Sequence, residues 1–463
     1  QKSKVTRSDY ERWRAGQDEA AVRIAADPDR LAFHVEPELG WLNDPNGLVQ
    51  VGDTYYIYHQ YDPFDAAHGG PVLWNHLTTK DFVTYENRGP VLFPDSDMDS
   101  SGAYSGSAFV RDGKIHYFYT GNVKHFDRDD YDYVLTGRDQ NQIHMVTDNA
   151  DELGKKQLAV GPLDYPDDIG THVRDPKILE HDGIYYMVLG ARTKDDRGCV
   201  LVFTSCDLES WKYATRIELG EQFGFMWECP DLFELDGELV LVCCPQGVPA
   251  EGWRYHNPHQ CVWFRIEADW DAPSFKIVGQ GVPPMVDAGF DFYAPQSFED
   301  VAGRRLMIGW VGCPDATAEN PTMARGWQCA LTVPRQLSMR DGRLCQLPAR
   351  ELEKLRGDCV RIHAGEIVAE PDRLFDALVS CEGAKTVELE IREGVFVRYA
   401  DGMLMLDMGD EGYGRDRRSV EVGELRDLRV LSDTTLVEIF ANGGEVALTT
   451  RTYSPAAPAM GLH

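Results

Sequence analysis

Residues 40–47, with the sequence GWLNDPNG, place a polar centre between apolar and aromatic flanks. Pro45 removes a backbone donor and Gly47 relaxes the backbone, so the stretch predicts a turn at the mouth of a strand. That strand is expected over residues 54–59, which are rich in Tyr and Ile. Asp44, held on such a corner, suits chemistry, because loops on a rigid scaffold carry function. The plain alternative is an Asx-turn, in which a side chain bonds its own backbone.

The same arrangement recurs along the chain. Five glycine turns, each followed by an aromatic or aliphatic strand, are spaced 61, 70, 54 and 66 residues apart, at Gly52, Gly113, Gly183, Gly237 and Gly303. Each unit has room for a four-stranded sheet, and radial repetition of such sheets is a β-propeller, here with five blades. Chance is the alternative, since Asp-Gly turns are common in β proteins.

A distinctive polar or aromatic residue lies 8 to 10 residues before each of these glycines. The five are Asp44, Ser105, Asp175, Glu228 and Tyr293. If the blades are equivalent, these side chains converge at one end of the central channel. Three of them are carboxylates, and like charges gathered in a funnel oppose folding and raise at least one pKa. Such a cluster indicates a functional site.

The length of 463 residues predicts more than one core, and the texture changes after about residue 345. The fold class expected is all-β. The division expected is a helical appendage (1–30), a five-bladed propeller (31–345), a linker (346–356) and a β-sandwich (357–463).

Local signals support the two ends of this division. Residues 8–26 read as one helix that opens with a capping box from Ser8 to Glu11. The linker, with its short charged run, is expected to be helical. In the sandwich, residues 387–391 alternate apolar and charged side chains, and 442–444 (NGG) predict a hairpin turn.

Composition bounds the partners and the compartment. Lys and Arg number 46 and Asp and Glu 76, so the net charge is −30, which argues against nucleic acid and anionic membranes as partners. The eleven cysteines show no CxxC spacing, so free buried thiols and a reducing, cytoplasmic location are expected. No signal peptide and no membrane-spanning apolar run are visible. The chain begins with Gln1 rather than Met, which leaves removal of an N-terminal segment open.

Two carboxylates with separate tasks in a funnel rich in aromatic residues are typical of glycoside hydrolysis. The sequence also resembles glycoside hydrolase family 32, the invertase and fructan-hydrolase family. The resemblance rests on residues 41–47 (WLNDPNG), 174–176 (RDP) and 228–231 (ECPD), with 104–107 (YSGS) and 291–296 (DFYAPQ) as two further motifs. It covers most of the chain, and it implies a five-bladed propeller followed by a sandwich.

The resemblance also implies roles. Asp44 is implied as the nucleophile, Glu228 as the general acid/base and Asp175 as the stabiliser of the transition state. Glu228 follows the apolar run 225–227, which suits a carboxyl that must hold a proton near neutral pH. The residues implied to line the fructose subsite are Asn43, Gln60, Trp74, Tyr104, Ser105, Arg174, Tyr293 and Trp310.

We therefore expect a retaining β-fructofuranosidase that acts on sucrose or short fructo-oligosaccharides, a small sugar partner, and no metal or cofactor. The alternatives are a sucrose-6-phosphate hydrolase, with Arg192, Lys194, Arg254 or His256 serving the phosphate, a fructan exo-hydrolase or a fructosyltransferase. A non-catalytic sugar-binding propeller is disfavoured, because all three carboxylates are present. The acidic run 127–132 lacks the Gly and the distal Glu of a calcium loop and is expected to be solvated. Oligomeric state is not readable from the sequence.

Overall fold

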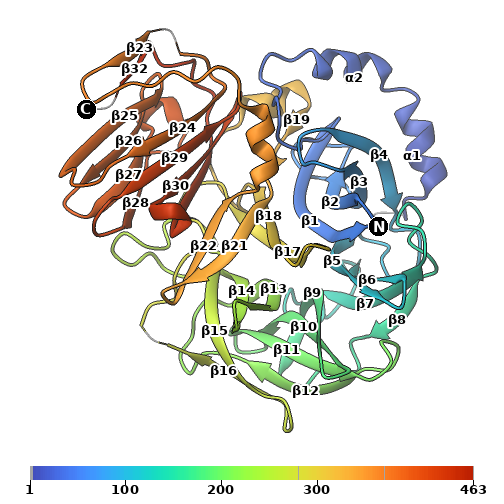
Figure 1. The fold of residues 1–463 in the computed structure, drawn as a ribbon. Helices are drawn as coiled ribbons and strands as arrows, with labels where there is room; N and C mark the ends of the chain where they lie inside the picture. Colours follow the sequence, from blue (N-terminus) through green and yellow to red (C-terminus); the bar gives the residue numbers. More distant parts are fainter. Residues whose placement is uncertain (1–3, 280, 370, 462–463) are drawn as a thin grey trace.

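The computed structural model describes residues 4–279, 281–369 and 371–461. Two short helices open the chain, α1 (Arg7–Arg14) and α2 (Asp18–Ala25), and lie beside the first sheet (Figure 1). The prediction of one helix over 8–26 is wrong. Thr6, not Ser8, caps α1, by accepting a hydrogen bond from the Asp9 backbone while Asp9 bonds back to Thr6. The break falls at residues 15–17, where Gly16 has low helix propensity.

Five antiparallel sheets follow in chain order (Figure 1). The first contains β1 (Gly40–Val51), β2 (Thr54–Asp62), β3 (Leu73–Thr79) and β4 (Tyr85–Leu92), with β19 (Trp327–Gln328) parallel to β1. The second contains β5 (Ala103–Arg111), β6 (Lys114–Lys124), β7 (Arg138–Thr147) and β8 (Gln157–Val160). The third contains β9 (Ile169–His181), β10 (Ile184–Thr193), β11 (Gly198–Ser205) and β12 (Lys212–Ile217).

The fourth sheet contains β13 (Met226–Leu235), β14 (Glu238–Gln246), β15 (Val262–Asp269) and β16 (Ser274–Val278). The fifth contains β17 (Tyr293–Glu299), β18 (Arg305–Val311), β21 (Arg335–Arg340) and β22 (Arg343–Pro348), with β20 (Ala330–Leu331) on β18. Every glycine of the sequence repeat lies in the turn between the first two strands of its sheet. In three of these turns the preceding Asp also has positive φ, at Asp112, Asp182 and Asp236, as the type I′ hairpin turn requires.

The stretch 40–47 is not a turn, so that part of the prediction is wrong. It is the start of β1, and the pairing of β1 with β2 is interrupted between Leu42 and Pro45 and again between Asn46 and Val49. Pro45, which cannot donate to the ladder, lies opposite His59 directly after the first interruption, and bulges are among the few places where a strand tolerates proline. Asn43 and Asp44 lie in the first interruption, which frees their side chains from the regular alternation of the strand.

The first strands of the other four sheets carry the same irregularity. Their pairing shifts within 103–106, 174–177, 228–231 and 293–296, which are the segments that carry the remaining sequence motifs. Three residues in these bulges have positive φ, namely Asp175 at 66°, Cys229 at 47° and Ala294 at 48°. Non-glycine residues adopt this conformation at a cost, and such strain gathers at functional sites. The repeat seen in the sequence is therefore a repeat of bulges as well as of turns.

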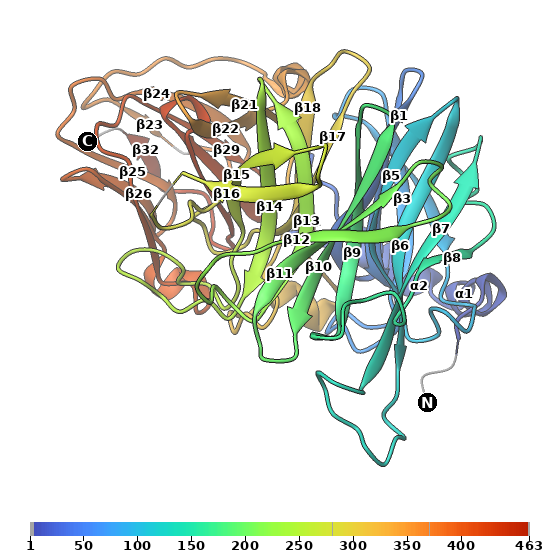
Figure 2. The ribbon, with the colours of Figure 1, turned by 90° about the horizontal axis from the view of Figure 1, so that it is seen from below.

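The C-terminal part contains two four-stranded sheets (Figures 1 and 2). One has β24 (Phe375–Ser380), β29 (Asp427–Ser432), β30 (Leu436–Ala441) and β31 (Val446–Arg451). The other has β25 (Thr386–Arg392), β26 (Val395–Ala400), β27 (Met403–Asp407) and β28 (Arg417–Glu421), and β23 (Ile367–Ala369) pairs with β32 (Ala459–Gly461). The predicted alternating strand is β25, and the predicted hairpin joins β30 to β31. Apolar residues of both sheets, such as Leu406 and Ile439, share one core.

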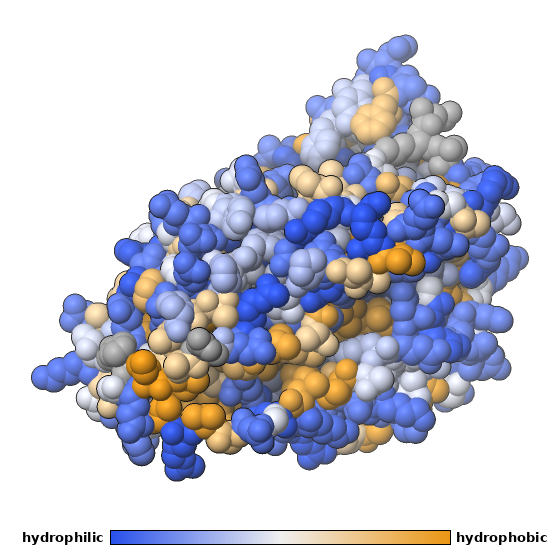
Figure 3. Space-filling model, turned by 90° about the horizontal axis from the view of Figure 1, so that it is seen from above, coloured by the Kyte–Doolittle hydropathy of each residue, from blue (hydrophilic) through white to orange (hydrophobic). Residues whose placement is uncertain are grey.

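Short 3-10 helices are η1 (Pro321–Arg325), η2 (Arg350–Leu355), η3 (Gly409–Gly412) and η4 (Asn442–Gly444). The expected linker helix is η2. The surface face in Figure 3 is mostly hydrophilic, as the net charge of −30 requires. Among the described residues no helix is both long and apolar enough to cross a membrane.

Candidate active site

The bulges of all five first strands meet around one narrow space. Each strand contributes a residue to its lining: Pro45 from β1, Gly106 from β5, Pro176 from β9, Pro230 from β13 and Pro295 from β17. The convergence expected from the sequence repeat is therefore present. The three acidic side chains lie at this meeting point, and hydrogen bonds connect their segments across neighbouring sheets.

Asp44 is held by neighbours from three strands. Ser105 on β5 donates a 2.5 Å hydrogen bond to Oδ2, and the Asn43 amide donates to Oδ1 at 3.2 Å. The Cys229 thiol lies 3.7 Å from Oδ2. Asn43 in turn is fixed by Gln60 on β2. Burial raises the pKa of Asp44 to about 6, with the Glu228 charge adding to the rise and the Ser105 hydrogen bond opposing it. Above that pH the carboxylate is ionised.

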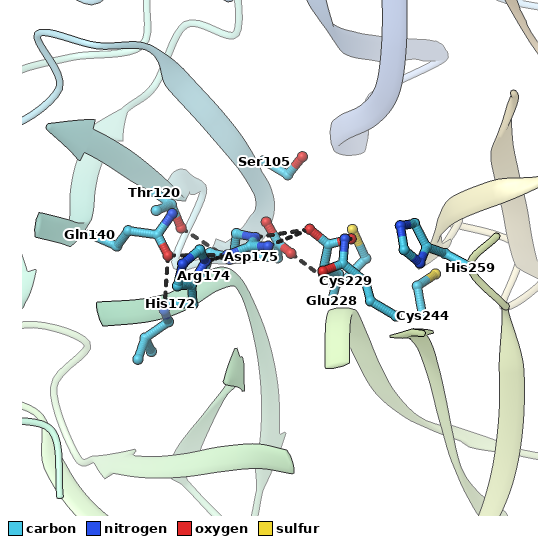
Figure 4. Close-up of polar contacts among 12 residues, drawn as sticks. Ser105, Thr120, Gln140, His172, Arg174, Asp175, Glu228, Cys229, Cys244 and His259 are labelled. Atoms are coloured by element: carbon cyan, nitrogen blue, oxygen red, sulfur yellow. Dashed lines mark hydrogen bonds and ion pairs between the residues drawn. The ribbon is translucent and has the colours of Figure 1, made fainter. Parts of the chain in front are cut away.

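Glu228 receives four donors, two on each oxygen, and Figure 4 shows the Arg174 side of this arrangement. Arg174 Nε and Nη2 bind Oε1 at 3.0 and 2.6 Å. Tyr293 Oη and Gln246 Nε2 bind Oε2 at 2.6 and 2.9 Å. The Tyr293 hydroxyl also lies 3.3 Å from the Cys244 carbonyl, so it has a second acceptor within reach. These contacts fix the plane of the carboxyl group.

Asp175 is fixed through its backbone and one oxygen. Its backbone N–H donates to Thr120 Oγ1 at 3.0 Å, and its Oδ2 accepts from the Cys229 backbone N–H at 2.8 Å. Burial raises the pKa of Asp175, the adjacent Arg174 charge lowers it, and the carboxylates of Glu228 and Asp44 raise it further. Arg174 thus serves two of the three carboxylates, Glu228 through hydrogen bonds and Asp175 through its charge.

The aromatic residues expected at the site lie at different depths. Trp41 is half-buried, stacks on His68 at 5.1 Å and meets the edge of Trp310 at 5.5 Å. Trp310 is 3% exposed and Tyr104 is half-buried. Trp74 is wholly buried, and its indole N–H donates to the Tyr104 carbonyl at 3.0 Å, so it fixes the backbone of Tyr104.

Several residues of this site escaped the sequence reading. They are Gln246, Cys229, Thr120, Gln140 and His172. Gln246 had one usable signal, because it is the first polar residue after the buried run of β14. Thr120, Gln140 and Cys229 bond to site residues on neighbouring strands, which no linear spacing reveals, whereas His172 lies two residues before Arg174 on the same strand.

Three of the four basic residues considered for a phosphate have local partners, and the fourth, Lys194, is exposed. Arg192 pairs with Asp196 at 2.7 Å and lies over Phe225. Arg254 lies over Trp253, and His256 Nε2 contacts the Gly252 carbonyl at 2.7 Å. Within the described part of the chain, no group of three or more His, Cys, Asp or Glu side chains is arranged to hold a metal ion.

Paired carboxylates with separate hydrogen-bond partners in an aromatic-walled funnel define a glycoside hydrolase. Comparison with known proteins agrees. The N-terminal domain model of glycosyl hydrolases family 32 matches residues 34–348, and the C-terminal model of the same family matches residues 408–463. The chain therefore belongs to glycosyl hydrolase family 32, and it is a hydrolase of the invertase type.

Individual relatives cover nearly the whole chain. The sucrose-6-phosphate hydrolase of Bacillus subtilis is 35% identical over 442 residues, covering 92% of this chain and 89% of that protein. The raffinose invertase of Escherichia coli is 34% identical over 446 residues, with shares of 92% and 89%. Among solved structures, the sucrose-6-phosphate hydrolase of Lactobacillus gasseri has a TM-score of 0.88 at 28% identity, covering 99% and 96%. A Bombyx mori β-fructofuranosidase mutant in complex with sucrose has a TM-score of 0.79 at 26% identity, covering 97% and 95%.

Proposed function

We propose that the protein is a retaining β-fructofuranosidase that releases terminal, non-reducing β-D-fructofuranosyl residues from sucrose or short fructo-oligosaccharides. One observation carries the proposal. Asp44 and Glu228 project from equivalent bulges on β1 and β13, and each has its own set of hydrogen-bond partners. Relatives with the printed names raffinose invertase and β-fructofuranosidase support the substrate class.

We further propose that the five sheets close into a five-bladed propeller. In Figure 1 the sheets follow one another around a common centre, and residues of all five first strands line the space there. The parallel pairing of β19 with β1 brings a late segment against the first sheet, as closure of a ring requires. The domain limits proposed are 1–30 for the appendage, 31–345 for the propeller, 346–356 for the linker and 357–463 for the sandwich.

The reaction proposed has two displacements. Asp44 attacks the anomeric C2 of the fructosyl unit while Glu228 gives its proton to the leaving oxygen, so the C2–O bond breaks, a covalent fructosyl-enzyme forms and the leaving sugar departs with a free hydroxyl. Water then attacks C2, Glu228 takes the proton from that water, and Asp44 is released as a carboxylate. Asp175 binds fructose hydroxyls and stabilises the charge that develops on the ring. The site residues proposed to contact fructose are Asn43, Gln60, Tyr104, Ser105, Arg174, Tyr293 and Trp310, with Trp74 behind Tyr104.

The chemistry is complete with these side chains and calls for no cofactor. A fructan exo-hydrolase or a transferase would use the same two displacements and differ in the leaving sugar or in the acceptor. The eleven cysteines are free and eight of them are buried, which supports the proposal of a reducing, cytoplasmic location.

A sucrose-6-phosphate hydrolase is the second candidate, favoured by the names of several curated relatives. Steady-state kcat/KM with sucrose, sucrose-6-phosphate, 1-kestose and inulin separates the candidates. The proposal expects fructose release from sucrose, with β-fructofuranose as the first anomer in an NMR time course. Preference for the phosphate ester by about a hundredfold would favour the second candidate, since that ratio equals about 2.7 kcal/mol of transition-state binding. α-Fructofuranose as the first product would exclude retention.

A further inference from the structure

His172 lies behind the ion pair between Arg174 and Glu228 and is absent from the motifs that identify the family. It stands on β9 two residues before Arg174, and alternate residues of a strand share a face. Figure 4 shows His172 and Gln140 on one side of the Arg174 guanidinium and Glu228 on the other. The His172 side chain is almost completely enclosed, at 1% exposure.

The hydrogen bonds of His172 define one tautomer. Its Nε2 lies 3.0 Å from the Tyr133 carbonyl, which can only accept, so Nε2 carries the hydrogen. Its Nδ1 therefore presents a lone pair to Arg174 Nη1 at 3.1 Å. Burial, together with the charges of Arg174, Arg138 and Arg192, lowers the pKa of His172 to about 2. A lowered pKa favours the neutral ring, which is the form that can accept from Arg174.

This lone pair restrains the rotation of Arg174. Nη1 donates to His172 Nδ1 and, at 3.3 Å, to Gln140 Oε1, which leaves Nε and Nη2 for Glu228 Oε1. The guanidinium is planar, so holding one edge aims the opposite edge. A neutral imidazole is needed here, because a charged one would repel Arg174 and could not accept.

The partner of His172 belongs to a projecting arm, residues 125–137, which joins β6 to β7 and extends beyond the sheets in Figure 2. Asp132 Oδ1 accepts from the backbone N–H groups of Val134 and Leu135, which stabilises the turn that carries the Tyr133 carbonyl. Thr171 donates to the Val134 carbonyl through both its backbone and its hydroxyl, at 2.7 and 2.9 Å. The arm therefore places the Tyr133 carbonyl, and with it the imidazole.

We infer that His172 is a positioning residue for proton transfer, because it holds Arg174 in the orientation that aims Glu228 at the leaving oxygen. The inference rests on the proposed role of Glu228 as the general acid. It assigns to the 125–137 arm a part in the same reaction, through the Tyr133 carbonyl. Two acidic side chains of the arm have hydrogen-bond partners within it. Asp132 accepts from the Val134 backbone and so stabilises the turn, and Asp130 pairs with Arg128.

Two substitutions separate the two contacts of the ring. The amide of His172→Asn can occupy the place of Nδ1 and accept from Arg174, but it cannot reach the Tyr133 carbonyl. The amide of His172→Gln reaches the place of Nε2 and can donate to Tyr133, but it leaves Arg174 Nη1 without this acceptor. Both variants are assayed with sucrose, whose leaving group needs a proton, and with an activated aryl β-fructofuranoside, whose leaving group does not.

The inference expects a split between substrates for His172→Gln only. Its kcat/KM for sucrose should fall about 10- to 100-fold, less than the full 10²- to 10⁴-fold contribution of general acid catalysis because Glu228 itself remains, and its kcat/KM for the aryl substrate should fall less than about threefold. His172→Asn should stay within about threefold of wild type on both substrates. His144→Gln is the matched control, because His144 is another buried histidine with a lowered pKa, of about 4, that contacts His116 rather than the site.

Equal losses on both substrates in His172→Gln would show a general structural role and overturn the inference. The inference would also be overturned if His172→Asn lost as much activity as His172→Gln. Should His172→Gln fail to fold, the same comparison on His172→Ser decides between the two outcomes. A wild-type enzyme that cleaves neither substrate would overturn the proposed function instead, so the two failures are distinguishable.

Discussion

Two groups of acidic side chains in this protein are buried, yet the pKa values of Asp44 and Asp175 in one are raised, whereas those of Asp433 and Glu438 in the other are lowered. The Asp44 cluster contains Asp44, Asp175, Glu228 and Arg174. The His34 cluster, between the fifth sheet and the C-terminal sheets, contains His34, Asp287, Arg335, Asp433 and Glu438. Burial raises the pKa of Asp44 to about 6, whereas the pKa of Asp433 is lowered to about 2.

Counter-charge explains the difference. In the His34 cluster, His34 Nδ1 lies 2.8 Å from Asp433 and Nε2 lies 2.7 Å from Glu438. Arg335 adds bonds to Glu438 at 2.6 Å and to Asp287 at 3.2 Å. Against burial, these carboxylates raise the pKa of His34 to about 9. Three carboxylates thus meet two cations there, but only one cation in the Asp44 cluster. Where cations nearly match the buried carboxylates, as in the His34 cluster, the ion pairs hold neighbouring segments of the fold together. Where they do not, as in the Asp44 cluster, the carboxyl pKa values rise, which is typical of functional sites.

The largest effect expected is from Asp44→Asn. Because the substitution is nearly isosteric but removes the nucleophile, kcat should fall by several powers of ten, on the order of 10⁵, with the thermal unfolding midpoint preserved. Steady-state release of fructose from sucrose measures the loss. Residual activity above about a tenth of wild type, with deamidation excluded by mass spectrometry, would contradict the assignment.

Glu228→Gln should lose a smaller and selective amount. Turnover of sucrose should fall about 10²- to 10⁴-fold, the usual contribution of general acid–base catalysis. An activated aryl β-fructofuranoside should restore the first step and give a burst, followed by slow release of fructose, because the base for water is then missing. Stopped-flow detection of the released aryl alcohol tests this. A variant that shows no burst and is slowed equally on sucrose and on the aryl substrate would contradict the role of Glu228 as the general acid/base.

In the balanced cluster, Arg335→Met should lower the free energy of unfolding by about 3–5 kcal/mol, because it leaves buried carboxylates unpaired. Activity per folded molecule should be retained. Urea unfolding measures the loss, with Arg343→Met as control. Arg343 is 62% exposed and pairs with Glu445 at the surface, so its loss should stay within about 1 kcal/mol. Equal effects of the two substitutions would remove the distinction between the clusters.

His34 links stability to pH. Its pKa is higher in the folded protein, about 9, than the ordinary 6.5, so the folded state binds the proton more tightly. The stabilisation is complete below about pH 6.5, declines as pH rises, and is gone above pH 9; the shift corresponds to a loss on the order of 3 kcal/mol. As the pH rises from 6 to 10, the thermal unfolding midpoint of the wild type should fall towards that of His34→Gln. A gap between them that is constant with pH would contradict the ion pair.

The smallest effect expected concerns the acidic limb of activity. As the proposed nucleophile, Asp44 must be ionised to attack, so with its pKa raised to about 6 we expect kcat/KM to fall about tenfold per pH unit below that value. Ser105→Ala removes a hydrogen bond that lowers this pKa, so the limb should move to higher pH. A pH profile with the activated aryl substrate checks both statements. An unchanged limb in Ser105→Ala would mean that another group sets it.

Much of the site was readable from the linear chain. The five glycine turns and the residues 8 to 10 positions before them gave the repeat, and hydrogen bonds join those residues or their immediate neighbours across the sheets. The prediction of a turn at 40–47 was wrong because proline usually indicates the end of a strand. Here β1 continues through Pro45 with a bulge beside it, and the sequence gives no sign of that bulge. The prediction of a single N-terminal helix was wrong because the chain breaks at residues 15–17, where Gly16 has low helix propensity, and the predicted cap was wrong because Thr6 rather than Ser8 caps α1.

The sequence by itself determined the all-β class, the repeat and the family, because hydrophobic period, turn glycines and motif residues are local properties of the chain. Only the tertiary structure decided how the charges are compensated. Arg174, Gln246 and Tyr293 reach Glu228 from three different sheets, and Asp433 meets His34 across 399 residues of chain. The pKa of a buried group depends on which charges and donors the fold brings within a few ångströms, and that proximity has no counterpart in linear spacing.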